Sequence, residues 1–378
     1  MSDHLPEVIV TEILKRLPVK ALVKSTSVCK SWYSLITNPN FIALHLSHTT
    51  APNKTYSLLR KSSDVIEYSN AQQFILHSDN DSFSEHEKLD LSYLNVTSDT
   101  PGTHLVKIVG LCDGLFCLFD KNLTRLIVWN PAIRVFITTS LRGRYKAKFF
   151  LLGFGFDSNK NDYKVVRIVY NYAGVGPLTE LVQPFVEIFE LKSNAWKTVA
   201  VENLSYALYD SGSYAYLNGY AHWFAQKEQG RKLTVASFDL SNEAFGELML
   251  PHSLAELSHL KLSLIVYRQS LAVVYPEDPK FDNNSYHCEK YSIWVMQEYG
   301  AHESWSKLFN IDLENRGGFR SVLGFQGNGG ILVENFNRKM ASYDPETQRV
   351  TPLEVDGFYF KVHSNYMESL VLLMGNRN

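Results

Sequence analysis

Residues 129–136 read WNPAIRVF, and the same arrangement returns along the chain. An aromatic residue is followed by turn-forming residues and, seven positions after it, by a second bulky residue. The four regular copies begin at Trp129, Phe189, Phe238 and Tyr343, and a fifth, Trp294 to Trp305, has a longer turn. Asn, Asp, Ser and Pro between apolar runs favour a tight turn. Each copy therefore predicts a β-hairpin.

A second hairpin is expected before each of these. Its turns are Asp113-Gly114, Asn161-Asp162, Asn218-Gly219, Arg268-Gln269 and Gly327-Asn328. Asp-Gly and Asn-Gly between apolar runs are the strongest short-range hairpin signals. Four strands that recur about every 50 residues are typical of the blades of a kelch-type β-propeller. Five such units lie between residues 104 and 353.

The remaining segments can supply a sixth blade. Residues 358–373 predict a hairpin with Ser364-Asn365 at its turn, and residues 55–76 predict two strands. Pairing strands from both ends of the array would remove open sheet edges. We therefore expect a mostly β fold, a kelch-like β-propeller of six blades, with five or seven as alternatives and two stacked antiparallel sheets as the rival fold. The polar, acidic segment 77–103 is expected to be a loop between blades.

The head of the chain has a different pattern. Ile9, Val10, Ile13, Leu14 and Leu17 form a helical stripe that Pro18 ends. From residue 5 to residue 46, 22 of 42 residues are apolar. A helical unit of this size cannot bury so much apolar surface against itself. Part of this face must therefore pack on the rest of the chain or on another protein.

Composition excludes several classes of protein. The chain has 378 residues, too many for one domain of about 150 residues. A net charge of −2 gives no electrostatic argument for binding nucleic acid or an anionic membrane. No run approaches the roughly 20 apolar residues of a membrane span, and the start lacks a signal-peptide pattern. Four Cys residues without a CxxC pair fit a reducing compartment. We expect the cytoplasm or the nucleus.

No catalytic or metal-binding constellation emerges from the residues. Cys112 and Cys117 have no His at ligand spacing, and His45 and His48 have no companion Cys. His222, in an expected strand, is interpreted as a packing residue. No nucleophile elbow is present, although a Ser-His-Asp set that forms only in the fold stays open. We therefore expect no cofactor, no metal and no catalytic residue.

Residues 5–46, LPEVIVTEILKRLPVKALVKSTSVCKSWYSLITNPNFIALHL, resemble an F-box. The resemblance implies that the apolar face docks on a Skp-family adaptor and, through it, on the cullin and RING subunits of a ubiquitin ligase. The residues it assigns to this face are Leu5, Pro6, Ile13, Leu14, Leu17, Pro18, Leu22, Cys29, Trp32, Leu35 and Ile36.

The body resembles the F-box-associated domain of plant F-box proteins. The motifs that match, from about residue 105 to 310, include GLCDGLFCL, VWNPAIRVF, LGFGFDSNKNDYKVVRI, LNGYAHWFA and SFDLSNEAFGELMLP. The expected domains are an F-box over 1–48 and a substrate-recognition propeller over 49–378. The resemblance implies a receptor that brings a protein to the ligase for ubiquitination and degradation. Two subgroups share the layout, pollen self-incompatibility proteins and immune regulators, so the target would be a ribonuclease or an immune receptor. A propeller hydrolase and a non-degradative scaffold are the rival functions.

Target contact is expected in loops that break the repeat, because binding residues concentrate on loops held by a rigid scaffold. The four irregular loops are 141–148, 171–183, 276–286 and 298–304. The basic run Arg142, Arg144, Lys146 and Lys148 is the predicted contact for an acidic patch on the target. A solvated loop without such a role is the alternative for this run.

Overall fold

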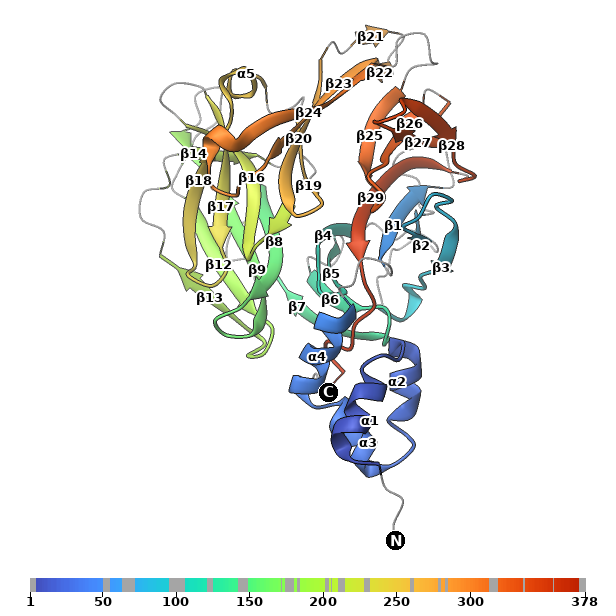
Figure 1. The fold of residues 1–378 in the computed structure, drawn as a ribbon. Helices are drawn as coiled ribbons and strands as arrows, with labels where there is room; N and C mark the ends of the chain where they lie inside the picture. Colours follow the sequence, from blue (N-terminus) through green and yellow to red (C-terminus); the bar gives the residue numbers. More distant parts are fainter. Residues whose placement is uncertain are drawn as a thin grey trace. The chain divides into compact units, whose positions relative to one another are not determined.

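The computed structural model describes most of the chain in two compact units. The first unit comprises 1–140, 326–328 and 357–378, and the second comprises 141–325 and 329–356. The residues described are 5–49, 55–62, 72–94, 106–120, 125–141, 149–170, 172–173, 180–181, 184–200, 204, 206–209, 215–227, 232–258, 262–277, 280–282, 285–312, 319–335, 337–355 and 357–373. Figure 1 shows the fold of the chain.

The head is helical, as its apolar period predicts. Its helices are α1 (Glu7–Leu14), α2 (Val19–Ser25), α3 (Lys30–Ile36) and α4 (Pro39–Thr49). Pro18 has φ −60° and ψ 150°. Its ring has no N–H to donate to a preceding turn, so it separates α1 from α2 and begins the latter.

The body consists of six antiparallel sheets, which are the blades of a six-bladed β-propeller. Blade 1 is β4 (Val106–Cys112), β5 (Leu115–Asp120), β6 (Arg125–Asn130) and β7 (Val135–Ser140). Blade 2 is β8 (Phe149–Asp157), β9 (Asp162–Tyr170), β12 (Phe185–Glu190) and β13 (Ala195–Val199). Blade 3 is β14 (Tyr206–Tyr209) and β15 (Ala215–Leu217), both paired with β16 (Tyr220–Lys227), then β17 (Leu233–Asp239) and β18 (Ala244–Met249).

Blade 4 is β19 (Ser263–Tyr267), β20 (Ser270–Pro276), β23 (Lys290–Met296) and β24 (Trp305–Asp312). Blade 5 is β25 (Phe319–Phe325), β26 (Ile331–Asn335), β27 (Met340–Asp344) and β28 (Arg349–Pro352). Blade 6 is β29 (Phe358–Tyr366), β1 (Tyr56–Ser62), β2 (Gln72–Ser78) and β3 (Glu85–Lys88). Six separate sheets confirm the propeller and exclude the rival fold of two stacked sheets.

Short elements interrupt this regular pattern. Two of them are two-stranded sheets, β10 (Tyr172–Ala173) with β11 (Glu180–Leu181) and β21 (Lys280–Asp282) with β22 (Ser285–His287). The others are α5 (His252–Ala255) and the 3₁₀ turns η1 (Ser92–Leu94) and η3 (His302–Ser304).

The seven-residue spacing between the two bulky residues, which predicts the hairpins, has a direct structural cause. In its four regular copies the two bulky residues face each other across the last hairpin, as in Trp129 opposite Phe136. The residue five positions after the first aromatic has a positive φ, 49° to 56°, at Arg134, Asn194, Glu243 and Gln348. A left-handed residue at this point closes the loop and sets the strand register. The spacing therefore reports the turn geometry.

The fifth copy does not follow this rule. Its longer turn shifts the register, so that Trp294 pairs with Lys307 and Trp305 pairs with Met296. The hairpin forms as expected, but the two Trp residues do not face each other. The Lys307 ammonium lies 5.7 Å from the centre of the Trp294 ring instead.

Blade 6 combines strands from both ends of the described chain, as predicted, but not through a second hairpin. The expected turn at Ser364-Asn365 lies inside the single strand β29, which pairs with β1 from Ser62 to Tyr56. Asn365 has φ 67°, and the register shifts between Tyr56 and Leu58. The turn-forming residue therefore produces a bulge, because β1 is available to pair beyond it.

The segment 77–103 is also more structured than predicted. It contributes β3 and η1, and Leu91 and Leu94 are buried in the core between blades 6 and 1. The sequence predicted a loop because acidic residues dominate the segment and Leu91 and Leu94 are its few buried apolar residues. Residues 95–103 lie outside the described part of the chain.

Candidate functional site

The helical head exposes a set of large apolar side chains. Six of them are between 45% and 73% exposed, namely Leu5, Val8, Ile9, Ile13, Val28 and Tyr33. Four of the six come from α1 and the residues just before it. Because several large apolar side chains exposed on one small domain often mark a binding site, this set, called the head patch below, is the candidate docking site.

The predicted docking residues fall into three groups. Leu5, Pro6, Ile13, Pro18 and Cys29 are exposed. Leu17, Trp32 and Leu35 are half-buried, and Leu14, Leu22 and Ile36 are buried. The exposed group can reach a partner directly, whereas the buried group forms the core that holds the helices in place.

A buried histidine fixes the turn between the first two helices. His45 of α4 has its Nε2 atom 3.0 Å from the carbonyl oxygen of Leu17. Burial lowers the pKa of His45, so the ring is neutral and can donate one N–H to that carbonyl. This bond positions Leu17 and Pro18, which the F-box resemblance assigns to the docking face.

The core of the head includes a residue from the far end of the chain. Leu370 is 1% exposed and packs with Leu14, Leu22, Ile36 and Phe41. Nothing in the local sequence of the head could have predicted this contact, because more than 300 residues separate the partners. The C-terminal segment is therefore part of the helical domain's core.

The same segment is bonded to blade 1. The Asn130 side-chain amide donates to the carbonyl oxygens of Ser369, at 3.0 Å, and Val371, at 2.8 Å. Ala132 and Ile133, in the next turn, pack against the helical core. A turn of blade 1 and the C-terminal segment thus both pack against the core of the helical head within the first unit.

One group among the described residues brings three potential metal ligands together, His86, Glu87 and Glu368. Lys20 of α2 already occupies it, because its ammonium lies 2.6 Å from a Glu87 carboxylate oxygen. The hydrogen bond to Glu87 raises the pKa of Lys20. The arrangement is an ion pair between the head and blade 6.

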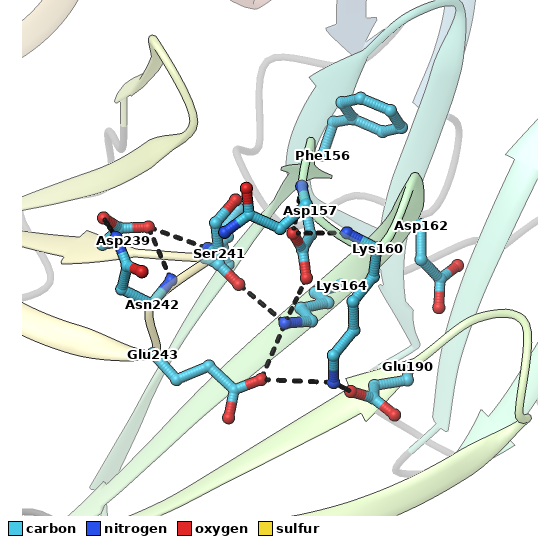
Figure 2. A network of polar contacts seen from close by, with 12 residues as sticks. Phe156, Asp157, Lys160, Asp162, Lys164, Glu190, Asp239, Ser241, Asn242 and Glu243 are labelled. Atoms are coloured by element: carbon cyan, nitrogen blue, oxygen red, sulfur yellow. Dashed lines mark hydrogen bonds and ion pairs between the residues drawn. The ribbon is translucent and has the colours of Figure 1, made fainter.

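The body contains a buried cluster of charged residues between blades 2 and 3 (Figure 2). The Lys164 ammonium is fully buried and lies 2.6 Å from Asp157, 2.7 Å from Glu243 and 2.7 Å from the carbonyl oxygen of Leu240. A lysine ammonium has three N–H donors, and these three acceptors match them. The cluster thus ties two blades together and leaves Lys164 no donor for a substrate.

The two lysines around this cluster complete it. Lys197 contacts Glu243 at 2.6 Å and Glu190 at 3.1 Å, and Lys160 contacts Glu190 at 2.7 Å. Burial opposes the charge on Lys197, but the hydrogen bonds to Glu243 and Glu190 outweigh it and raise the pKa of Lys197. The three lysines balance the three carboxylates of Asp157, Glu190 and Glu243.

His222 is a packing residue, as predicted. It is fully buried, with Nδ1 3.1 Å from the Ala215 carbonyl oxygen and Nε2 2.8 Å from the Tyr299 hydroxyl. Tyr299 belongs to the loop 298–304, so this irregular loop of blade 4 packs on blade 3. One of the four loops predicted to contact a target therefore has a structural role.

The predicted basic contact cannot be placed. Arg142, Arg144, Lys146 and Lys148 all lie outside the described residues. Of the described helices, none has both the length and the hydropathy that a membrane crossing requires.

The described chain thus combines a helical domain that exposes apolar side chains with a six-bladed propeller. Comparison with protein families identifies the same two domains. The model described as F-box domain matches residues 2–44, and the model described as F-box associated beta propeller domain matches residues 58–372. The second match covers most of the chain, so the chain belongs to the family of F-box proteins with an F-box associated β-propeller.

Relatives in Arabidopsis thaliana are similar over most of their length. A putative F-box protein is 29% identical over 84% of this chain and 76% of its own. A second F-box protein is 28% identical over 96% and 91%, and the F-box protein CPR1 is 24% identical over 93% and 84%. A solved dipeptidyl peptidase 4 of Porphyromonas gingivalis covers 79% of this chain and 44% of its own at 10% identity, with a TM-score of 0.38. A similarity this low carries no argument.

Proposed function

We propose that this chain is the substrate-recognition subunit of a Skp–cullin–F-box ubiquitin ligase. The head patch supports the proposal most directly, because it exposes apolar side chains on the domain that the F-box model matches. An F-box domain indicates binding to a Skp-family adaptor, which connects it to the cullin and RING subunits. The proposal includes the predicted boundary between an adaptor-binding domain over 1–48 and a substrate-recognition domain over 49–378.

The chain itself would perform no chemistry. Its propeller would hold a target protein close to ubiquitin activated on another subunit. Holding two reactants together replaces a bimolecular encounter with an effectively unimolecular step. The candidate targets are a ribonuclease of self-incompatibility, an immune receptor or another protein, and the proposal does not choose among them. The cytoplasm and the nucleus are the compartments that suit this role.

Charge insertion in the head patch tests the adaptor assignment. Ile13 is 48% exposed, so Ile13→Asp should leave the fold intact while placing a charge in the interface. Removing an interface anchor commonly costs about 2–4 kcal/mol, and an unpaired buried charge costs more. We expect Ile13→Asp to abolish co-purification of a Skp-family adaptor. Leu17→Asp should also abolish adaptor binding. It should in addition destabilise the head, because Leu17 is half-buried.

The matched control lies on the propeller. Leu308 in β24 is 40% exposed, and Leu308→Asp makes the same chemical change away from the head. It should bind adaptor like the parent. Normal adaptor binding by both Ile13→Asp and Leu17→Asp would refute the docking assignment. A non-degradative scaffold would bind adaptor but leave the lifetime of every bound protein unchanged.

A further inference from the structure

Three neighbouring strands of the first unit concentrate positive charge. Strands β29 and β1 pair in blade 6, and β4 of blade 1 contacts β29. Their sequences, FYFKVHSNY, YSLLRKS and VKIVGLC, contain four Lys or Arg residues and no Asp or Glu. The whole chain has a net charge of −2, so the positive charge of these strands is a local feature.

Two of the cations lie directly opposite each other. Arg60 of β1 is the register partner of Lys361 of β29. Facing residues of an antiparallel pair lie on the same side of the sheet, and like charges at such positions destabilise the pairing. Lys361 is exposed and Arg60 is half-buried. Because local rules of stability are broken mainly at functional sites, this pair indicates a ligand of opposite charge.

His363 lies on the same side of the sheet. It is two residues from Lys361 on β29 and opposite Leu58 on β1, and side chains two residues apart on a strand share a face. Burial lowers the pKa of His363, and the charges of Arg60 and Lys361 lower it further. Both cations therefore lie close enough to act on this ring, which is neutral at pH 7.

Arg60 is held beside blade 1. Its Nη1 atom donates to the carbonyl oxygen of Val106, at 3.5 Å, in the first residue of β4. A backbone carbonyl positions the guanidinium without neutralising its charge. The planar guanidinium has five N–H donors, and its shape matches a carboxylate. The side chain is thus oriented while its positive charge is kept.

The cation pair lies away from the part of blade 6 that meets the helical head. That contact is at the other end of β29, where Tyr366 faces Tyr56 and Leu370 enters the core of the head. In Figure 1, β29 runs toward the head. Arg60 is four residues from Tyr56 along β1, which is roughly 13 Å in a strand. The pair therefore does not overlap the head patch.

The chemistry of the pair narrows the class of ligand. A guanidinium and an ammonium bind carboxylates through charge-assisted hydrogen bonds. Proteins that bind double-stranded DNA commonly contact about six to ten phosphates, and polybasic membrane-binding segments carry about four to eight cations. Two facing cations are too few for either of these, but they match two neighbouring acidic side chains.

We infer that Arg60 and Lys361 form a binding site for an acidic segment of the target protein, with two or more neighbouring Asp or Glu side chains. That the ligand belongs to a target rests on the proposed function, whereas the site itself does not. The side chains of 171–183 and 278–287, in two of the loops predicted to contact a target, lie outside the described residues. Those two assignments therefore stay predictions.

Binding of a defined acidic peptide tests the inference. The probe is fluorescein-labelled Gly-Ser-Asp-Glu-Asp-Glu-Ser-Gly, and the control peptide has Asn and Gln in place of Asp and Glu. Fluorescence anisotropy gives the dissociation constant of each peptide for the purified full chain at low and at physiological ionic strength. The variants are Arg60→Gln and Lys361→Gln. The matched control is Lys88→Gln, at an exposed position on β3 of the same blade.

We expect the parent to bind the acidic peptide at least tenfold more tightly than the amide peptide, and less tightly as ionic strength rises. Each of the two variants should lose about tenfold in affinity, as for loss of a hydrogen bond to a charged group, and Lys88→Gln should match the parent. Melting temperatures establish that the variants fold. Lys361 is exposed, so Lys361→Gln keeps the test decisive even where Arg60→Gln is destabilised.

Three results would overturn the inference. They are equal affinity of the parent for the two peptides, parent-level affinity in Lys361→Gln, and an equal loss in Lys88→Gln. Tighter binding of a poly-uridine oligonucleotide than of the acidic peptide would also overturn it, in favour of nucleic acid. Adaptor binding is measured separately. If Ile13→Asp and Leu17→Asp keep the adaptor while the acidic peptide still binds, the proposed function fails and the peptide site stands.

Discussion

His222 shows how much a single buried side chain determines in this fold. Its Nδ1 faces a carbonyl oxygen, which can only accept, so Nδ1 carries the proton and Nε2 accepts from the Tyr299 hydroxyl. Burial lowers the pKa of His222 to about 4. The ring is therefore neutral at pH 7, because a protonated ring would place a positive charge in a buried position.

This residue gives a pH dependence of stability with a defined sign. An unfolded histidine has a pKa of about 6.5, so between pH 6.5 and 4 the unfolded chain binds more protons than the folded chain. The stabilisation is complete above pH 6.5 and is lost as the pH falls, by about 2 kcal/mol at pH 5. We expect His222→Gln to lose less unfolding free energy than the parent between pH 7.5 and 5, measured by urea unfolding.

The comparison isolates His222 from other groups. Burial also lowers the pKa of His45 and His77, but both remain in the variant and act equally in the two proteins. An identical loss in parent and variant would show that His222 is not responsible.

At the scale of elements, the Lys164 cluster holds blades 2 and 3 together. Removing the cation leaves Asp157 fully buried without its partner. Breaking a buried pair in this way commonly costs about 3–5 kcal/mol. We expect Lys164→Met to lower the free energy of unfolding by this amount, measured with urea at pH 7.5. Lys160, whose side chain is 51% exposed, is the control, and Lys160→Met should cost within about 1 kcal/mol. Equal effects would contradict the assignment of Lys164 as the anchor.

The elements also show where local sequence is sufficient. Asp113-Gly114 and Asn218-Gly219 predict their hairpins because the residues themselves adopt the positive φ that the turn requires. Asn365 carries the same preference, yet it bends a strand, because β1 pairs beyond it. A turn signal specifies backbone geometry, and only the available partner strand decides whether the chain reverses there.

Local sequence is also insufficient to define the docking face. Helical period identifies the apolar residues of the head but not which of them are covered. Leu14, Leu22 and Ile36 were predicted to dock, and they are buried together with Leu370. Val8 and Tyr33 were absent from the prediction and are exposed. Burial depends on a segment more than 300 residues away, so the local pattern could not separate the two groups.

At the scale of the molecule, the C-terminal segment contributes to two structural parts of the first unit, blade 6 and the helical head. Strand β29 completes blade 6, where Tyr366 stacks on Phe116 of blade 1 with ring centres 5.1 Å apart. Four residues later Leu370 enters the core of the helical head. One short stretch therefore supports both a propeller blade and the domain proposed to bind the adaptor.

Shortening the chain tests this dual role. Deleting 355–378 removes β29 and Leu370, which exposes the edge of β1 and opens the core of the head. An unpaired edge promotes aggregation, so we expect the truncated chain to aggregate or to lose cooperative unfolding. Leu370→Ala separates the two effects, because it keeps β29 intact. It should cost about 2–5 kcal/mol, as for other buried leucines, and should weaken adaptor binding at elevated temperature. Leu308→Ala, at an exposed position, should change neither property. A soluble truncated chain with the parent's melting temperature would show that neither blade 6 nor the head depends on this segment.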